Sequence, residues 1–184
     1  MGLFHQKIVL LDGAEGSNLM KAGMPQGVCV EQWLLEHPEH FSLQAGYAAS
    51  GADVVYAPTF GANRAKLAQF GLQDKVESIN SRIVKLTREA VGGRALVAGN
   101  VSPTGLFGEQ SFSVLIDVYQ EQMKALKAAG VDLIAAETLM NMADARACLL
   151  AAKRCGLDTL ITITVDENGK TLSGMPLLPC LVTL

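Results

Sequence analysis

The chain has 184 residues, of which 49% are hydrophobic and 18% are charged, and its mean hydropathy is +0.26. This composition excludes intrinsic disorder, and a chain of this length buries roughly 70% of its unfolded surface without needing disulfides. The 15 basic and 18 acidic side chains give a net charge of −3, which excludes the basic surface typical of nucleic-acid or anionic-membrane binding. We therefore expect a small-molecule partner.

The sequence shows no pattern of a targeting or membrane segment. Its first apolar run ends at Asp12, too early for a signal peptide, and no stretch reaches the roughly 20 apolar residues that span a bilayer. The cysteines have neither CxxC spacing nor the density of a secreted scaffold. We expect a cytoplasmic protein whose cysteines are reduced and pack in the core: Cys29, Cys148, Cys155 and Cys180.

Short apolar runs predict five β-strands, at residues 8–11, 53–59, 95–99, 133–136 and 159–165. None of these runs alternates cleanly between apolar and polar residues. This is typical of parallel strands that are covered on both faces.

Helical patterns lie between the predicted strands. The clearest covers residues 76–90, where apolar side chains at steps of three and four form one stripe. The others cover residues 38–50, 118–129 and 142–155, the last two ending just before a glycine. The sequence therefore predicts five βα units in series, within a single domain of residues 1–184.

Such units form either an open doubly wound sheet or a (β/α)₈ barrel. The dinucleotide-binding version is disfavoured, because Gly13-Ala14-Glu15-Gly16 lacks the GxGxxG spacing. A complete barrel takes about 250 residues, so five units would make an unfinished one.

Each predicted strand ends in a side chain that can bind a polar ligand: Asp12, Thr59, Asn100 with Ser102, Glu137 and Asp166. In parallel α/β folds these ends converge on one face, where binding sites form. Each residue alone also fits a structural role, such as the turn that begins at Asp166. Their common position indicates a site.

Glu137 directly follows an apolar run and has no cationic residue near it in the sequence. A buried carboxylate needs a positive charge or hydrogen-bond donors. If Asp12 faces Glu137 across a barrel mouth, the pair could hold a ligand ammonium group, while the N–H groups of residues 13–17 receive a carboxylate. That combination suits an α-amino acid. The two carboxylates could equally act as acid and base or bind a metal ion, and their spacing does not separate these uses.

Five motifs in order cover almost the whole chain. The first is Leu11-Asp12-Gly13-Ala14-Glu15-Gly16-Ser17, and the others lie within residues 51–63, 99–105, 132–138 and 166–174. Together they resemble the homocysteine S-methyltransferase family, most closely the N-terminal homocysteine-binding domain of cobalamin-dependent methionine synthases. In the first motif, Ser17 stands where the family pattern DGAxGT has threonine.

The resemblance implies an α/β fold of the (β/α)₈ TIM-barrel type, truncated here to about its first five βα units. It also implies that homocysteine binds at the carboxyl ends of the strands. Asp12 and Glu137 would hold its ammonium group, and the amides of residues 13–17 its carboxylate. The substrate-binding residues would be Asp12, Gly13, Ala14, Glu15, Gly16, Ser17, Thr59, Asn100 and Glu137, whereas no catalytic residue is identified.

The family also implies a zinc ion that binds the homocysteine sulfur as a thiolate, which accepts a methyl group and gives methionine. Its zinc ligands are three cysteines, from an Asn-Cys step and a Cys-Cys pair, and this sequence has neither. Cys148 and Cys155 are about 10 Å apart along one predicted helix, too far to share an ion. We therefore expect no metal ligands in this chain and no activity from the chain alone. Cobalamin or folate would act only through other domains.

Two alternatives remain open from the sequence. One is a non-catalytic amino-acid-binding or interaction module, either a gene fragment or half of a split enzyme. The other is an unrelated α/β enzyme that uses Asp12 and Glu137 as an acid–base pair. Because an unclosed sheet exposes strand edges, we also expect self-association, or a second chain that completes the barrel.

Overall fold

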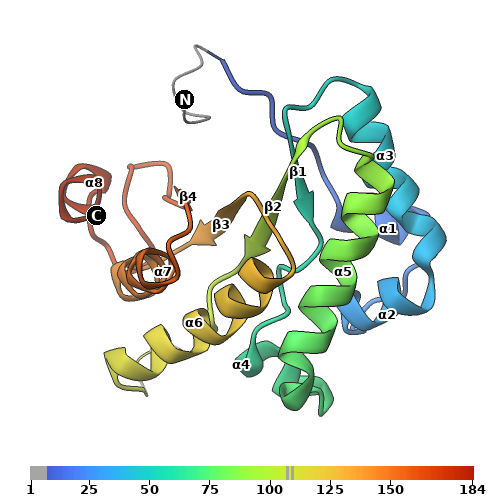
Figure 1. The fold of residues 1–184 in the computed structure, drawn as a ribbon. Coiled ribbons are helices and arrows are strands. Elements are labelled where there is room, and N and C mark those ends of the chain that lie inside the picture. The colour runs from blue at the N-terminus through green and yellow to red at the C-terminus, as the bar shows by residue number, and fades with distance from the viewer. Residues whose placement is uncertain (1–7, 107, 109) are drawn as a thin grey trace.

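The computed structural model describes residues 8–106, 108 and 110–184 (Figure 1). At its centre is one sheet of four parallel strands in the order β1-β2-β3-β4. The strands are β1 (Val54–Ala57), β2 (Leu96–Val101), β3 (Leu133–Leu139) and β4 (Thr159–Ile163). Strands that follow one another in the chain are therefore neighbours in the sheet, as serial βα units predict.

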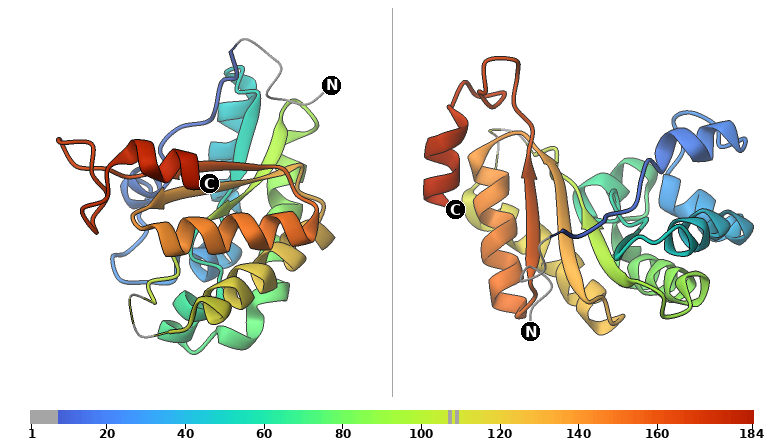
Figure 2. Two further views of the ribbon diagram at one scale, coloured as in Figure 1. Left: turned by 90° about the vertical axis from the view of Figure 1, so that its left-hand side faces the viewer. Right: turned by 90° about the horizontal axis from the view of Figure 1, so that it is seen from above.

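One long helix connects each pair of neighbouring strands: α5 (Val76–Val91), α6 (Phe112–Ala128) and α7 (Met142–Cys155). These helices follow one another around the outer face of the curved sheet (Figures 1 and 2). The shorter elements are α1 (Gly16–Lys21), α2 (Val30–Glu36), η2 (Pro38–Phe41), α3 (Ser42–Ala49), α4 (Arg64–Leu67), η3 (Ala68–Phe70), η4 (Gln73–Lys75) and α8 (Leu177–Thr183). Within the described ranges, no helix has both the length and the apolar character needed to cross a membrane.

The amphipathic pattern of α5 explains its position. Its apolar stripe, which includes Val76, Ile79 and Ile83, is buried. The helix ends where Gly92 takes a left-handed conformation with φ of 60°. The helices predicted over residues 76–90, 118–129 and 142–155 are confirmed by α5, α6 and α7, and η2 with α3 confirms the one predicted over 38–50.

Alternate residues of the strands face opposite sides of the sheet. The side chains that face the helices join the main hydrophobic core, and they include Val55, Ala57, Val97 and Ile134. The side chains on the inner face form a smaller cluster of Val54, Tyr56, Ala98, Leu133 and Ala135. Both faces of the sheet are therefore covered, which explains why the strands do not alternate in polarity.

Residues 8–11 do not form the first strand that the sequence predicts. They make a single bridge, between Leu11 and Val54. The backbone pairing is confined to a few bonds, in which Leu10 O accepts the N–H of Asp53 at 2.8 Å and Asp12 N–H donates to Val54 O at 3.1 Å. The segment thus lies beside β1 without a continuous ladder. The other four predicted strands are confirmed, although β1 and β4 each end two residues early.

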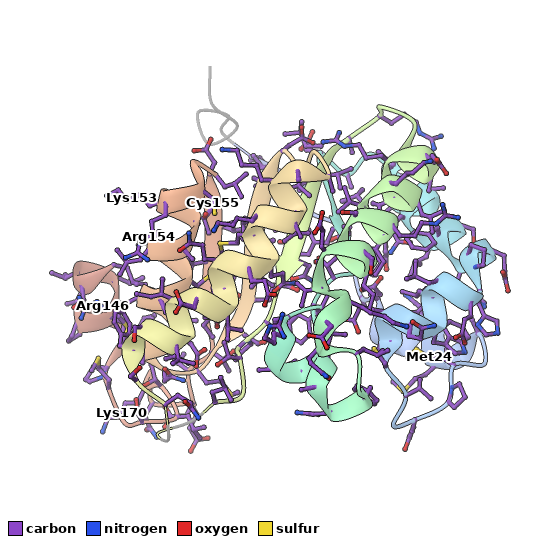
Figure 3. The ribbon with its side chains drawn as sticks, turned by 60° about the horizontal axis from the view of Figure 1, so that its bottom comes forward. Met24, Arg146, Lys153, Arg154, Cys155 and Lys170 are labelled. Atoms are coloured by element: carbon purple, nitrogen blue, oxygen red, sulfur yellow. The ribbon has the colours of Figure 1, made fainter. Side chains whose placement is uncertain are left out.

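All four cysteines are buried and free, as core packing predicts. Two of them, Cys148 and Cys155, lie on α7. On the same helix Arg146, Lys153 and Arg154 are exposed, and Figure 3 shows these basic side chains on the part of the molecule away from Met24.

Candidate functional site

A cavity of about 300 Å³ opens near the carboxyl ends of three strands. Tyr56, Asn100 and Glu137 reach it from β1, β2 and β3, respectively. Its full lining is Leu11, Asp12, Gly13, Ala14, Glu15, Gln44, Tyr47, Tyr56, Asn100 and Glu137. Three carboxyl groups therefore meet in a space that suits a small molecule.

Asp12 is held at this cavity by β1. Its backbone N–H donates to Val54 O at 3.1 Å. Its carboxylate Oδ2 accepts the backbone N–H of Tyr56 at 2.7 Å. The single bridge of the N-terminal segment is therefore enough to fix this carboxylate beside the strand ends.

Glu137 lies at an irregularity in β3. The pairing of β3 with β4 shifts register between Ala136 and Leu139, and Thr138 takes φ of 55°, in the left-handed region. That conformation is unfavourable for a β-branched residue, and such irregularities often re-aim side chains beside binding sites. Thr138 is held there by its N–H, which donates to Thr162 Oγ1 at 3.2 Å, and by its hydroxyl, which donates to Glu137 O at 2.7 Å.

Two buried amide side chains face the carboxyl groups. Asn100 Nδ2 donates to Glu137 Oε2 at 3.0 Å, and Gln44 Nε2 donates to Glu15 Oε1 at 2.9 Å. Asn100 and Gln44 are only 5% and 2% exposed, and the oxygen of each amide has no hydrogen-bond partner within the described part of the chain. A buried acceptor without a partner is unfavourable, so both oxygens favour a ligand that donates hydrogen bonds.

Side chains of α3 and α1 fix the segment of residues 13–17, whose last two residues begin α1. The Tyr47 hydroxyl donates to Ala14 O at 2.7 Å, and Asn18 Nδ2 donates to the same oxygen at 2.6 Å. A Cβ atom on Gly13 would lie 3.0 Å from Tyr47 Cε1, so this close approach of loop and ring favours glycine. The loop amides consequently have a defined place at the edge of the cavity.

Burial and neighbouring negative charge raise the pKa of two of these acidic groups. Burial raises the pKa of Asp12 to about 6, the Tyr56 N–H opposes this, and the Glu137 carboxylate adds to it. Burial raises the pKa of Glu15 to about 8, and the charges of Asp12 and Glu31 add to the effect. Crowded negative charge of this kind would be relieved by a cationic ligand.

A second cavity of about 640 Å³ shares Glu15, Asn100 and Glu137 with the first. Burial lowers the pKa of Lys66 in this cavity, and its ammonium group lies 4.8 Å from the centre of the Phe60 ring. The remaining lining residues are Gly16, Val28, Cys29, Val30, Glu31, Pro58, Gly61, Gln69 and Phe70. The two cavities therefore adjoin at the amide and carboxyl groups described above.

The structure brings six of the nine predicted binding residues to the first cavity: Asp12, Gly13, Ala14, Glu15, Asn100 and Glu137. Gly16 lines the second cavity instead. Ser17 is exposed on α1 and lines neither. Thr59 is fully buried behind the cavities, where its Oγ1 donates to Asn100 O at 2.8 Å.

The other polar strand ends have structural roles. Asp166 Oδ1 accepts the backbone N–H groups of Asn168 and Lys170, both at 2.9 Å, which makes Asp166 a turn residue. Ser102 is buried, and its hydroxyl donates to Pro103 O at 3.2 Å. The convergence predicted from the sequence therefore includes Asp12, Asn100 and Glu137 but not these two.

Four contributions to the site are not predicted from the sequence. Gln44 and Tyr47 are two of them, although their spacing of three residues places them on one face of a helix. Tyr56 lies inside a predicted strand, and only the alternation of that strand could indicate that it faces inward. The sequence pattern predicts a role for the backbone N–H of Glu15, whereas in the structure its residue, with its carboxyl group, also lines the cavity.

Each carboxyl group of the cavity accepts an amide hydrogen bond: Asp12 from Tyr56, Glu15 from Gln44, and Glu137 from Asn100. Among residues 8–106, 108 and 110–184, no group of three or more His, Cys, Asp or Glu side chains is placed to hold a metal ion. None of the ion pairs within these ranges involves a carboxyl group of the cavity.

Comparison with solved structures shows close similarity to the homocysteine methyltransferase MmuM from Escherichia coli. Its metallated form superposes with a TM-score of 0.84 at 25% identity, over 98% of this chain and 71% of that one. Its oxidised form gives a TM-score of 0.83 at 25% identity, over 98% of this chain and 70% of that one. This likeness confirms the barrel-type α/β fold predicted from the sequence, and the chain spans about 70% of the length of that structure.

Sequence comparison leads to the same family. Methionine synthase from Mycobacterium leprae is 25% identical in an alignment 191 residues long. The alignment covers 92% of this chain and 16% of that protein. The chain thus spans about a sixth of the length of this relative. The sequence profile described as Homocysteine S-methyltransferase matches residues 9–184. The chain therefore belongs to the homocysteine S-methyltransferase family.

Proposed function

We propose that the chain is a homocysteine-binding domain that presents homocysteine for methyl transfer to its sulfur, giving methionine. The observation that carries this proposal is the meeting of Asp12, Glu15 and Glu137 in one cavity, where the buried amides of Asn100 and Gln44 each leave an oxygen without a partner among the described residues. Family membership removes the alternative of an unrelated α/β enzyme with an acid–base pair.

The ammonium group of homocysteine fits the acceptors of this cavity. It carries three N–H donors and one positive charge, and the carboxylates of Asp12 and Glu137 with Asn100 Oδ1 offer acceptors for them. Charge-assisted hydrogen bonds of this type are stronger than neutral ones. The raised pKa of Asp12 supports the proposal, because a cation beside this carboxyl group relieves its repulsion with Glu137.

The carboxylate of homocysteine would then bind the backbone N–H groups of residues 13–17. Successive amides in such a loop form a concavity that favours anions. Tyr47 and Asn18 hold this loop by Ala14 O, which keeps the amides in place before the ligand arrives. The zwitterion would thus lie between two oppositely polarised parts of one cavity.

The described residues do not fit the zinc site that the family implies. Cys29 precedes α2, Cys148 and Cys155 lie on α7, and Cys180 lies on α8. No group of metal-ligating side chains forms within the ranges that the structure describes. We therefore assign substrate binding, and no activation of the thiol, to these residues. Methyl donors such as cobalamin or folate compounds would reach the site through other domains.

We further propose that a second chain, or a second copy, covers the free edge of β4. Within the described ranges β4 pairs with β3 alone. Exposed apolar side chains follow in the chain, among them Leu172 at 76%, Leu178 at 72% and Val182 at 80% exposure. Unpaired edges recruit strands from other chains. If a second copy covers this edge, sedimentation velocity should show a dimer or larger species, and a monomer at all concentrations would contradict that arrangement.

Calorimetric titration with homocysteine and two analogues tests the proposed binding mode. 4-Mercaptobutyrate lacks the ammonium group and 3-mercaptopropylamine lacks the carboxylate. Loss of either group should weaken binding by about tenfold or more, because each removes charge-assisted hydrogen bonds. Equal affinity for homocysteine and 4-mercaptobutyrate would contradict the role of the carboxyl groups.

The zinc content measured beside that titration separates an enzyme from a binding module. A content of about one zinc atom per chain, with zinc bound more tightly when homocysteine is present, would favour the enzyme. Homocysteine binding by zinc-free protein would favour the non-catalytic amino-acid-binding module.

A further inference from the structure

Glu31, near the start of α2, is a buried carboxyl group that has no part in the binding mode proposed above. It is 5% exposed. None of the ion pairs in the described ranges includes it. Burial raises its pKa, and hydrogen bonds from its surroundings oppose the rise. Burial of a carboxyl group costs free energy unless the group is paired or hydrogen-bonded. The hydrogen bonds of Glu31 therefore indicate what this residue does.

Glu31 makes a close contact with the segment that follows β1. Its Oε1 accepts the backbone N–H of Gly61 at 2.5 Å, and its Oε2 lies 3.4 Å from Cys29 Sγ. A Cβ atom on Gly61 would lie 2.8 Å from Oε1 and 3.2 Å from Oε2. Only glycine at position 61 therefore allows the carboxyl group to approach the backbone this closely.

Gly61 lies within a tight turn that reaches the binding cavity. The turn is closed by Ala62 N–H, which donates to Thr59 O at 3.0 Å. Thr59 Oγ1 donates to Asn100 O at 2.8 Å. Asn100 in turn donates from its side chain to Glu137 at 3.0 Å. A continuous series of contacts thus leads from Glu31 to the carboxylate at the cavity.

Other side chains also hold this turn. Gln122 Nε2 donates to Thr59 O at 2.7 Å, and Asn80 Nδ2 donates to Ala62 O at 2.8 Å. These bonds come from α6 and α5, so the turn remains attached to the helices without Glu31. Loss of Glu31 should therefore move the turn without unfolding it.

We propose that Glu31 is a positioning residue for the homocysteine site. Through the Gly61 amide it fixes the turn of residues 59–62, and through Thr59 it sets the position of Asn100 and its bond to Glu137. The effect on homocysteine affinity rests on the proposed function. The effect on Asn100 does not, because it is a property of the ligand-free protein.

Three variants test this role. Glu31→Ala removes the acceptor for Gly61, whereas Glu31→Gln keeps an oxygen acceptor and removes the charge. Glu36→Ala is the matched control, since Glu36 is an exposed glutamate on the same helix. Gly61→Ala is an independent way to break the hydrogen bond between the Gly61 N–H and Glu31, because the added Cβ atom would displace the Glu31 carboxyl group.

Two measurements are needed for each variant. The NMR signals of the Asn100 side-chain amide report its bond to Glu137 in ligand-free protein. Calorimetric titration gives the affinity for homocysteine. We expect Glu31→Ala and Gly61→Ala to shift the Asn100 signals and to weaken binding about tenfold, whereas Glu31→Gln stays within about twofold of the original chain.

The outcomes separate positioning from a general effect on stability. A lower melting temperature for Glu31→Ala, with unchanged Asn100 signals and unchanged affinity, would overturn the proposal. So would equal losses in Glu31→Gln and Glu31→Ala, because the retained acceptor would then have no effect. If the original chain does not bind homocysteine, the proposed function fails, and the Asn100 signals alone decide whether Glu31 positions this residue.

Discussion

Asn100 Nδ2 donates a hydrogen bond of 3.0 Å to Glu137 Oε2, which joins the ends of two neighbouring strands at the wall of the cavity. The same asparagine leaves its Oδ1 buried without a partner within the described residues. One side chain thus orients a carboxylate and presents an acceptor beside it. This pairing is the local arrangement on which the proposed ammonium site depends.

Replacing Asn100 by alanine should weaken homocysteine binding about tenfold, because a hydrogen bond to a charged group contributes roughly 1.5–3 kcal/mol. Calorimetric titration measures the change. Asn168→Ala is a suitable control, since this residue lies in the turn that begins at Asp166 and does not line the cavity. Equal affinities of the two variants would remove Asn100 from the site.

Thr138 provides a test of the irregularity that places Glu137. Thr138→Gly tolerates φ of 55°, whereas Thr138→Val keeps the β-branched strain and loses the hydroxyl bond to Glu137 O. We expect the valine variant to be less stable than the glycine variant by about 1 kcal/mol in urea unfolding. A valine variant as stable as the glycine variant would show that the left-handed conformation is not retained in solution.

The position of the 13–17 loop should depend on Gly13. Gly13→Ala places a Cβ atom 3.0 Å from Tyr47 Cε1, so the loop or the Tyr47 ring must move by a few tenths of an ångström, and homocysteine affinity should fall several-fold. Gly46→Ala is the matched control, because a Cβ atom there meets nothing within 4 Å. Titration calorimetry on both variants checks the prediction, which fails if the two substitutions have the same effect.

The raised pKa values predict how stability depends on pH. Unfolded carboxyl groups ionise near pH 4, whereas Asp12 and Glu15 keep their protons in the folded protein until about pH 6 and about pH 8. Between these values the unfolded chain binds fewer protons than the folded one, so stability falls as pH rises from about 4 to 8. Thermal unfolding at a series of pH values should show this fall.

The Glu15→Gln variant isolates that contribution. Its stability should fall less between pH 5 and 8 than that of the original chain, because glutamine does not titrate. Glu167→Gln, an exposed carboxyl group in a turn, should leave the profile unchanged. Identical profiles for Glu15→Gln and the original chain would contradict the raised pKa.

Homocysteine affinity should change in the opposite direction. Because the proposed ammonium site needs Asp12 in its ionised form, and ionised Glu15 nearby adds negative charge, affinity should rise from pH 5 to 8 as these groups lose their protons. Titration calorimetry across this range measures the rise. An affinity that falls with pH would indicate that a protonated carboxyl group is the form that binds.

The regular elements could be predicted because their signals are local. The stripe of Val76, Ile79 and Ile83 sets one face of α5, and Gly92 ends the helix in a left-handed conformation. The segment 8–11 could not be placed in the same way, because whether an apolar run becomes a strand depends on pairing with a distant partner. Its backbone pairing with β1 is confined to residues near Leu11.

The site could be predicted in part for a similar reason. Parallel strands bring their carboxyl ends together, so Asn100 and Glu137 were expected to meet, and they do. The same rule selected Thr59, but β1 ends at Ala57, and the turn that follows buries Thr59 behind the cavity. The left-handed Thr138 carries no sequence signal, because its residue type disfavours that conformation.

The central claim is that Glu137 holds the ammonium group of homocysteine, and a ligand-by-variant titration tests it most directly. The affinities of Glu137→Gln and of the original chain are measured for homocysteine and for 4-mercaptobutyrate, with Asp166→Asn as the control for a carboxyl-to-amide change. We predict that Glu137→Gln weakens homocysteine binding at least about tenfold and leaves 4-mercaptobutyrate binding unchanged. Equal losses for both ligands, or no loss for homocysteine, would contradict the account.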